Sequence, residues 1–319
     1  MIFTRFSGQN DILGDVEMNF LLAMMTLHRV DGFGERKLFE LAPSVMKMIE
    51  ENQISTESLC DLANRGTLIP KCDVAEVQSW YEESKSNSHL WSEGGIQVTT
   101  AFSPDYPPLL KETSKHPFFL YYKGDISPLS KNNIAIVGTR KPTAMGERQA
   151  KSIGKRIIQA GFGVVSGLAL GCDTAGHEGA LEGGGYTCAI LAHGLDIITP
   201  RKNIELAQRI LENGGALVSE HNPGVPPARR NYAMRNRIQS ALSSHVIVIE
   251  TALNGGTMLT AKYAVEQNRL LGVLSFAESD SSSEYAEGVN EISNNLSGKI
   301  LYSTDDVLSY VQQKPPEEE

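Results

Sequence analysis

Apolar runs of four residues recur along the C-terminal part of the chain. They cover residues 134–137, 163–166, 188–191, 216–219, 246–249 and 271–274. Stretches with apolar positions at helical spacing lie between several of them, at 147–160, 204–212 and 259–268. Short strands that are apolar on both faces and alternate with helices are typical of a parallel sheet covered on both sides. We therefore predict a doubly wound α/β domain over residues 131–311, with ligand sites at the carboxyl ends of its strands.

The first 85 residues have a different pattern. Apolar positions repeat at helical spacing over 21–27, 37–41 and 45–49, which predicts a small helical domain over residues 1–85. The segment 30–34 (VDGFG) is either a plain turn between helices or a helix-hairpin-helix-like turn whose amides hold a phosphate. Residues 86–130 are predicted to connect the two domains through a short strand near 117–125, whose aromatic side chains we expect to pack against the next domain. Residues 312–319 (QQKPPEEE) are predicted to be a disordered tail.

Composition excludes some classes of protein. The chain has 319 residues, of which 41% are hydrophobic and 21% charged, as in ordinary globular proteins. A formal net charge of −9 argues against a protein coated in positive charge, although a local basic groove is compatible with it. We identify no signal peptide and no apolar run that approaches the ~18 residues of a membrane span. The expected location is the cytoplasm, with no membrane partner.

The cysteines carry no metal-binding pattern. Cys60, Cys72, Cys172 and Cys188 form no C-x-x-C pair and have no histidine at ligand spacing. We expect buried, reduced thiols and no zinc site or disulfide framework.

The loop after the first predicted strand of the α/β domain is a candidate anion site. Its residues are Gly138, Thr139, Arg140 and Lys141. A glycine permits a sharp turn beside a bound group, the amides at the following helix start can hold an anion, and arginine suits phosphate. The spacing is not G-x-G-x-x-G and no acidic residue closes the second strand, so NAD is not expected. We predict no cofactor.

The loop after the second strand contributes Ser166 and Gly167 to the candidate site. Asp173 is interpreted as an N-cap of the helix that begins near residue 174. His177 lies one turn into that helix. It is either a hydrogen-bonded structural histidine or a general base, and the sequence offers no nucleophile beside it.

A basic cluster follows the fourth strand. Four arginines fall within nine residues, together with an aromatic side chain, and the candidate members are Arg229, Arg230, Asn231, Tyr232, Arg235, Asn236 and Arg237. Such a run is either a solvated basic face or a site for single-stranded nucleic acid, which needs cations for the backbone and an aromatic ring for a base.

The fifth loop adds Gly255, Gly256 and Thr257 at the start of a helix, again a pattern for an anion pocket. Thr257 and Met258 follow Gly256 where a Walker motif has its lysine and hydroxyl residue, so no P-loop ATPase activity is expected.

Together these segments resemble the DprA/Smf family. The similar stretches occur in the family's order and spacing over roughly residues 100–305: IAIVGTR, VVSGLALGCDTAGHEGAL, GLDIITPRKN, GGALVSE, RNYAMRNRIQSALS, VIVIETALNGGTMLTAKYAVEQNR and GVNEIS. The resemblance implies a Rossmann-like domain that forms a homodimer, binds single-stranded DNA and loads the recombinase RecA during natural transformation or recombination. It implies phosphate binding by Arg140 and DNA contacts by Arg229 and Tyr232, and Arg201 is included among the expected DNA contacts.

Two departures from the family pattern bear on binding. Leu170 stands where the family usually has a cation, and Cys172 replaces an isoleucine. We also expect no C-terminal winged-helix domain and therefore no duplex-sensing role.

Two alternatives to strand binding remain. The first is an enzyme like the Lonely Guy-type phosphoribohydrolases, but Thr260 stands where their catalytic glutamate would lie, so we expect no catalysis. The second is a nucleotide-sensing module of a stress or phage-defence system, with a free nucleotide in the same pocket.

Overall fold

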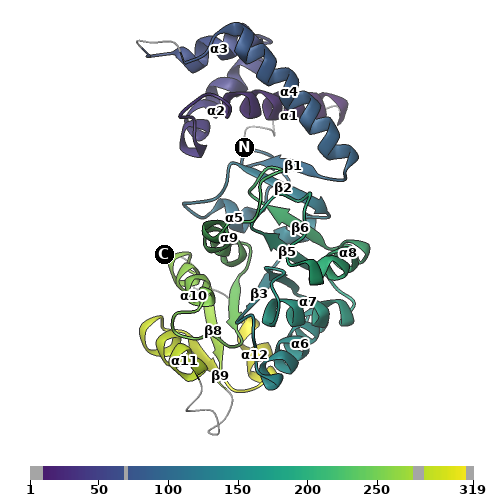
Figure 1. Cartoon of the computed structure of the whole chain (residues 1–319), viewed down its shortest axis with the longest axis vertical. Helices are drawn as coiled ribbons and strands as arrows, with labels where there is room; N and C mark the ends of the chain where they lie inside the picture. The colour runs from purple at the N-terminus through teal and green to yellow at the C-terminus, as the bar shows by residue number, and fades with distance from the viewer. Residues whose placement is uncertain (1–9, 68–70, 276–283, 314–319) are drawn as a thin grey trace. The chain divides into compact units, whose positions relative to one another are not determined.

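The chain forms two compact units (Figure 1). The computed structural model describes residues 10–67, 71–275 and 284–313. One unit comprises Met1–Tyr106 and Pro117–Leu120, and the other Pro107–His116 and Tyr121–Glu319. These limits differ from the domain limits that we predicted, because residue 85 lies inside a helix, α4 (Val74–Glu93), that continues the first unit. Of the predicted tail, residues 314–319 lie outside the described residues.

The first unit is built mainly from helices. These are α1 (Asn10–Leu27), α2 (Glu35–Glu50), α3 (Thr56–Asn64) and α4, followed by the strand β1 (Gln97–Thr100). Local sequence sets two of the helix starts, since Ser55 with Ser58 and Asp73 with Glu76 form capping boxes at α3 and α4. The predicted small helical domain is therefore present.

The aromatic stretch that precedes the α/β unit packs only in part as we expected, with the buried Tyr121 donating its hydroxyl to the Asn222 carboxamide within that unit. The Phe118 ring contacts the rings of Phe20, Phe39 and Phe102, all within the helical unit. Phe119 likewise contacts His28 of that unit. The sequence pattern predicted the strand near residues 117–125, but it did not indicate which residues each aromatic ring would contact. Any apolar surface can accept an aromatic side chain.

One sheet organises the second unit. Its strands are β2 (Phe119–Gly124), β3 (Asn133–Val137), β4 (Gly163–Ser166), β5 (Thr187–Leu191), β6 (Ala216–Ser219), β7 (His245–Val248), β8 (Leu270–Leu274) and β9 (Lys299–Leu301). From β2 onward the strand order is β2-β6-β5-β4-β3-β7-β8-β9. The pairs from β6 to β9 are parallel, whereas β2 runs antiparallel to β6. The prediction of a doubly wound, mostly parallel sheet is confirmed.

Helices cover both faces of this sheet (Figure 1). Ile134 and Ile136 of β3 pack with residues of α6 (Ala144–Gln159), α7 (Cys172–Glu182) and α12 (Thr304–Val311). Ala135 and Val137, which alternate with them, pack with residues of α10 (Gly256–Glu266) and α11 (Glu284–Asn295). Both faces of β3 are thus buried, which is why its sequence is a continuous apolar run. The remaining helices are α5 (Pro108–Lys111), α8 (Ile204–Glu212) and α9 (Arg229–Ala241), with the 3₁₀ turns η2 (Ser127–Ser130) and η3 (Arg201–Asn203).

The stretch 259–274 contributes to α10 and forms β8, and β8 is not an edge strand of the sheet. β8 pairs with both β7 and β9, and its residues Leu271 and Val273 belong to the core. The strand β9, which follows β8 in the sheet, was not predicted, because three residues carry little pattern.

The winding of the sheet reverses beside β3. From β3 the chain adds β4, β5 and β6 on one side, and then crosses to β7 on the other side of β3. In open α/β sheets, ligands bind at the carboxyl ends of the two strands that flank such a reversal. The loops after β3 and β7 therefore mark the expected site. No helix among the described residues is long and apolar enough to cross a membrane.

Candidate nucleic-acid interface

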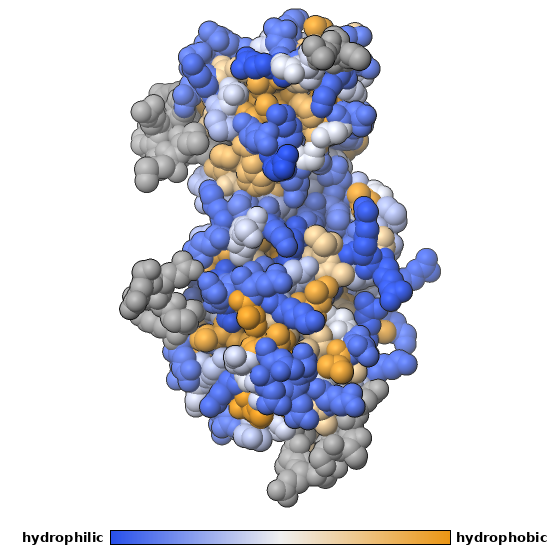
Figure 2. Space-filling view, turned by 90° about the vertical axis from the view of Figure 1, so that its left-hand side faces the viewer, coloured by the Kyte–Doolittle hydropathy of each residue, from blue (hydrophilic) through white to orange (hydrophobic). Residues whose placement is uncertain are grey.

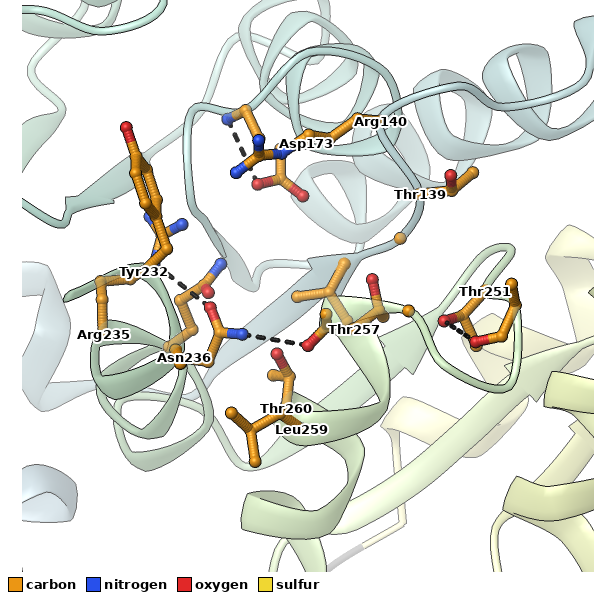
Figure 3. Close-up of a pocket in the computed structure, with 18 of the residues that line it drawn as sticks. Thr139, Arg140, Asp173, Tyr232, Arg235, Asn236, Thr251, Thr257, Leu259 and Thr260 are labelled. Atoms are coloured by element: carbon orange, nitrogen blue, oxygen red, sulfur yellow. Dashed lines mark hydrogen bonds between the residues drawn. The ribbon is translucent and has the colours of Figure 1, made fainter. Parts of the chain in front are cut away.

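A pocket of about 860 Å³ opens at the point where the sheet reverses (Figure 3). Its walls come from the loops after β3 and β7, the loop before α7, and the helices α9 and α10. The lining residues that carry the argument are Gly138, Thr139, Arg140, Lys141, Asp173, Arg229, Tyr232, Arg235, Asn236, Gln239, Gly255, Gly256, Thr257 and Thr260.

The β3–α6 loop is closely fitted to its neighbours. A Cβ on Gly138 would lie 2.4 Å from the Cys172 Sγ, so only glycine fits there. The Thr139 amide donates to the Glu250 carbonyl at 2.8 Å. These contacts place Arg140 and Lys141 in the pocket wall.

The start of α6, which we expected to hold a ligand anion, is partly occupied by a carboxylate of the protein. The buried Glu250 carboxylate accepts hydrogen bonds from the Thr143 amide at 2.8 Å and the Thr143 hydroxyl at 2.6 Å. Thr143 in turn caps the Gly146 amide at 3.0 Å. The protein thus satisfies this helix start with its own carboxylate, leaving less room for a ligand anion. Sequence alone did not indicate this, since the two residues are 107 positions apart.

The starts of α9 and α10 differ from that of α6. Ala228 and Gly255 are their N-caps, and neither helix start receives a side-chain cap from a described residue. Both starts line the pocket through Ala228, Arg229, Gly255 and Gly256. Exposed amides and the helix dipole favour an anion at such positions. The anion pocket predicted from Gly255, Gly256 and Thr257 stays a prediction, now with the uncapped start of α9 beside it.

An arginine and an aromatic ring meet at the mouth of the pocket. The Arg140 guanidinium lies 5.2 Å from the centroid of the Tyr232 ring, within the range of a cation–π contact. One residue comes from the β3–α6 loop and the other from α9. Figure 3 shows Arg140 and Tyr232 above Asn236, with Thr257 and Thr260 of α10 across from it.

Arg235 is buried behind this mouth. Its Nη1 donates to the Gly167 carbonyl at 2.8 Å and to the Ile190 carbonyl, so it ties the ends of β4 and β5 to α9. A Cβ on Gly167 would lie 2.5 Å from that Nη1, which explains the glycine. Burial lowers the pKa of Arg235 to about 10, which leaves the side chain charged near neutral pH.

Asp173 is not an N-cap, as we had interpreted it, but holds the loop before α7 through hydrogen bonds to its backbone. The N-cap of α7 is Gly171, and Asp173 lies in the first turn. Its carboxylate accepts from the amides of Gly167 at 3.2 Å and Ala169 at 3.3 Å. Burial raises the pKa of Asp173, and the charge of Arg235 opposes that shift.

His177 is a structural histidine. It is fully buried, and its Nδ1 lies 2.7 Å from the Thr187 hydroxyl. Burial lowers its pKa to about 3, so the ring is neutral near pH 7. The structural interpretation is confirmed, and His177 is not among the residues that line the pocket.

Eleven of the seventeen predicted site residues line the pocket, and six do not. The absent six are Ser166, Gly167, Arg201, Arg230, Asn231 and Arg237. The side chains of two of them bond elsewhere in the protein: the Ser166 hydroxyl donates to the Ile136 carbonyl, and Arg237 pairs with Glu220 at 2.6 Å. Helical periodicity separates the basic cluster, because residues one or two positions apart point in different directions. Leu170 is also outside the lining residues.

Several lining residues were not predicted as ligand contacts. Gln239 and Asn236 follow Tyr232 at helical spacing, so a period of 3.6 residues applied to α9 would have found Gln239. Asn254, Leu259 and Tyr285 had no such signal. The Tyr285 hydroxyl donates to the Lys141 carbonyl at 2.7 Å across 144 positions of sequence.

The fold and site define a doubly wound α/β protein with a cationic, aromatic-bearing pocket at the reversal of its sheet. The family model for DNA recombination-mediator protein A matches residues 97–312. The chain belongs to this family, which confirms the resemblance to the DprA/Smf proteins.

Curated relatives support this assignment. Protein Smf of Escherichia coli K12 is 38% identical over 207 residues, which cover 65% of this chain and 53% of that protein. DNA processing protein DprA of Bacillus subtilis is 37% identical over 195 residues, which cover 61% of this chain and 65% of that protein. The match therefore spans between about half and two thirds of these relatives.

Solved structures share the fold. DprA of Streptococcus pneumoniae superimposes with a TM-score of 0.67 at 24% identity, covering 94% of this chain and 98% of that one. DNA processing protein A of Helicobacter pylori, whose structure was described for its single-stranded DNA binding mode, gives a TM-score of 0.60 at 27% identity. That match covers 68% of this chain and 96% of the other.

Proposed function

We propose that this chain binds single-stranded DNA in the pocket at the sheet reversal and does so without catalysis. The observation that carries the proposal is the convergence of two uncapped helix starts, α9 and α10, with Arg140, Lys141 and Arg229. Phosphates suit helix amides and arginine, and Tyr232 supplies a ring on which a base can stack. The H. pylori relative supports the choice of a single strand as ligand.

Binding without chemistry is supported by the polar groups of the pocket. Among its described lining residues the carboxylate is that of Asp173, which is already bonded to the amides of Gly167 and Ala169. Thr260 lies in the pocket but is a poor general acid or base. A phosphoribohydrolase activity would release base from a nucleoside monophosphate, and we expect none in that assay.

Salt dependence tests the ligand. A fluorescent oligo-dT titrated at about 50 mM and about 200 mM salt should lose roughly 50-fold in affinity if about four phosphates are held, given a slope near −0.7 per contact. A single nucleotide should lose only a few-fold. Arg140→Ala and Arg229→Ala should each weaken oligo-dT binding and flatten the slope by about one contact. Undetectable oligo-dT binding by the unmutated protein would overturn the proposal, and tight nucleotide binding with a shallow slope would favour the nucleotide-sensing alternative.

The resemblance to the family also suggests protein partners. We propose that the chain forms a homodimer and loads RecA onto the bound strand during recombination, including natural transformation. Large apolar side chains are exposed on α9, α10 and the loop between β7 and α10 at Met234, Val265 and Leu253. Figure 2 shows one face of the molecule, on which small groups of apolar side chains (orange) lie among hydrophilic ones (blue). Light scattering tests the dimer, and co-sedimentation of RecA with the protein on oligo-dT tests the second interaction.

A further inference from the structure

Four side chains on one face of α9 line the pocket, and their chemistry changes along the helix. Arg229, Tyr232, Asn236 and Gln239 follow at spacings of three, four and three residues, and all four line the pocket. Residues at these spacings share one side of a helix. The series begins at the uncapped helix start with a cation, continues with an aromatic ring and ends with two carboxamides. It matches the order of groups in a nucleotide, from phosphate to the edge of the base.

The two carboxamides differ in their partners. The Asn236 Nδ2 donates to the Gly256 carbonyl at 3.2 Å and its Oδ1 accepts from the Arg235 Nε at 3.4 Å, so Asn236 braces α9 against α10. The Gln239 side chain makes no hydrogen bond to any residue that the structure describes, although the residue is only 2% exposed. The adjacent Thr260, at the same 2% exposure, lines the pocket as well.

A carboxamide that bonds to no described protein group has its donor and acceptor free for a hydrogen-bonding ligand. Gln239 is positioned in the wall of the pocket, where a ligand would meet it. A carboxamide presents a donor and an acceptor side by side. The nucleobase edge that best complements this pair in protein complexes is that of adenine, which offers N6 as donor and N7 as acceptor.

We propose that the Gln239 carboxamide reads one nucleobase of the bound strand and favours adenine. The inference rests on the proposed function and deepens it. Phosphates lie at the helix starts with Arg140 and Arg229, the base enters between α9 and α10, and Gln239 pairs with its edge. Backbone contacts and stacking by themselves give little base preference. This one side chain supplies a preference that the rest of the pocket lacks.

The experiment compares oligo-dA with oligo-dT of equal length, measured by fluorescence anisotropy on the full chain. The variant is Gln239→Met, which keeps the length of the side chain and removes its hydrogen bonds. The preference for oligo-dA over oligo-dT should fall by at least about five-fold in the variant, the lower limit for one bidentate base contact. The base stacking within each free oligonucleotide is the same for both proteins. It therefore cancels when the preference of the variant is divided by the preference of the unmutated protein.

Controls separate the possible outcomes. Gln208→Leu changes an exposed glutamine of α8 that bonds Glu212, and should leave the preference unchanged. If Gln239→Met fails to fold, Gln239→Glu keeps the shape, and its acceptor-only carboxylate should shift the preference from adenine toward cytosine. An unaltered preference in both variants, with oligo-dT still bound, would overturn the base-reading role alone. Loss of all binding by the unmutated protein would overturn the proposed function, and the role with it.

Discussion

The first turn of α9 and its later turns contain the same residue type in opposite environments. Arg229 is exposed at the start of the helix and lines the pocket. Arg235 and Arg237 are each only 4% exposed and bond to protein groups, namely the carbonyls of Gly167 and Ile190 and the carboxylate of Glu220. A sequence pattern that counts four arginines as one basic cluster therefore contains two populations.

The difference shows how the protein places cations at a ligand site. An exposed guanidinium remains available to a phosphate, and its charge is hydrated until the ligand arrives. A buried guanidinium is stable only when its donors are satisfied within the protein, so its role is structural. Arg235 and Arg237 fix α9 to the strand ends, and this rigid helix in turn presents Arg229 and Tyr232.

Arg237→Met should give the largest effect, on stability. The side chains of Arg237 and Glu220 are 5% and 11% exposed, so the variant leaves a nearly buried carboxylate without its partner. Removal of one member of such a pair costs about 3–5 kcal/mol of the free energy of unfolding. Urea denaturation followed by circular dichroism measures it.

The double variant Arg237→Met with Glu220→Leu is the control for that prediction. It should recover much of the lost stability, because neither charge is then left unpaired. Equal losses in the single and double variants would show that packing, and not the ion pair, determines the role of Arg237.

Acid should destabilise the layer behind the pocket through His177. Its pKa is lowered to about 3 in the folded protein, against about 6.5 when unfolded. Above pH ~6.5 both states are neutral and the stability is fully present. Between pH ~6.5 and ~3 only the unfolded state binds the proton, so about 1.4 kcal/mol is lost per pH unit, or roughly 2.7 kcal/mol at pH ~4.5.

The variant His177→Asn isolates this contribution. It should be less stable than the unmutated chain at pH 7, since the ring and its bond to Thr187 are lost, but its stability should fall less steeply with acid. Chemical denaturation at several pH values gives both slopes. Parallel slopes for the two proteins would contradict the assignment.

Tyr232 lines the pocket one turn after Arg229 on α9, and its substitution tests the contribution of the ring to binding. Tyr232→Ala should weaken oligo-dT binding by about 1–3 kcal/mol, the contribution of one stacked base, and should leave the free energy of unfolding nearly unchanged. Tyr232→Phe keeps the ring and should bind almost normally. A large loss in Tyr232→Phe would mean that the hydroxyl, and not the stacking surface, makes the contact.

Leu170→Lys should give the smallest effect. Leu170 is 37% exposed, in the loop before α7, but is not among the pocket-lining residues. A lysine there should strengthen oligo-dT binding only at low salt and steepen the salt slope by up to about 0.7, as for one added phosphate contact. An unchanged slope would place the bound strand away from this loop.

Much of the fold could be predicted from pattern alone. The runs at 163–166 and 216–219 coincide with β4 and β6, and the stretch 204–212 coincides with α8. Strands that are buried on both faces need apolar side chains at every position, so their sequences stand out. The short β9 and the extent of α4 were not predicted, since three residues carry little pattern and α4 has few buried positions.

The sequence by itself determined the doubly wound sheet and the segments after its strands that bear Arg140, Tyr232 and the paired glycines, because strand burial and segment composition are local properties. Only the tertiary structure decided which of these groups face one pocket. Glu250 occupies the start of α6, Glu220 binds Arg237, and Gln239 lies in the pocket wall, although its neighbour Ser240 is buried elsewhere. These outcomes depend on contacts between residues distant in sequence and on the direction in which each turn of α9 points, and neither is encoded in a count of residue types.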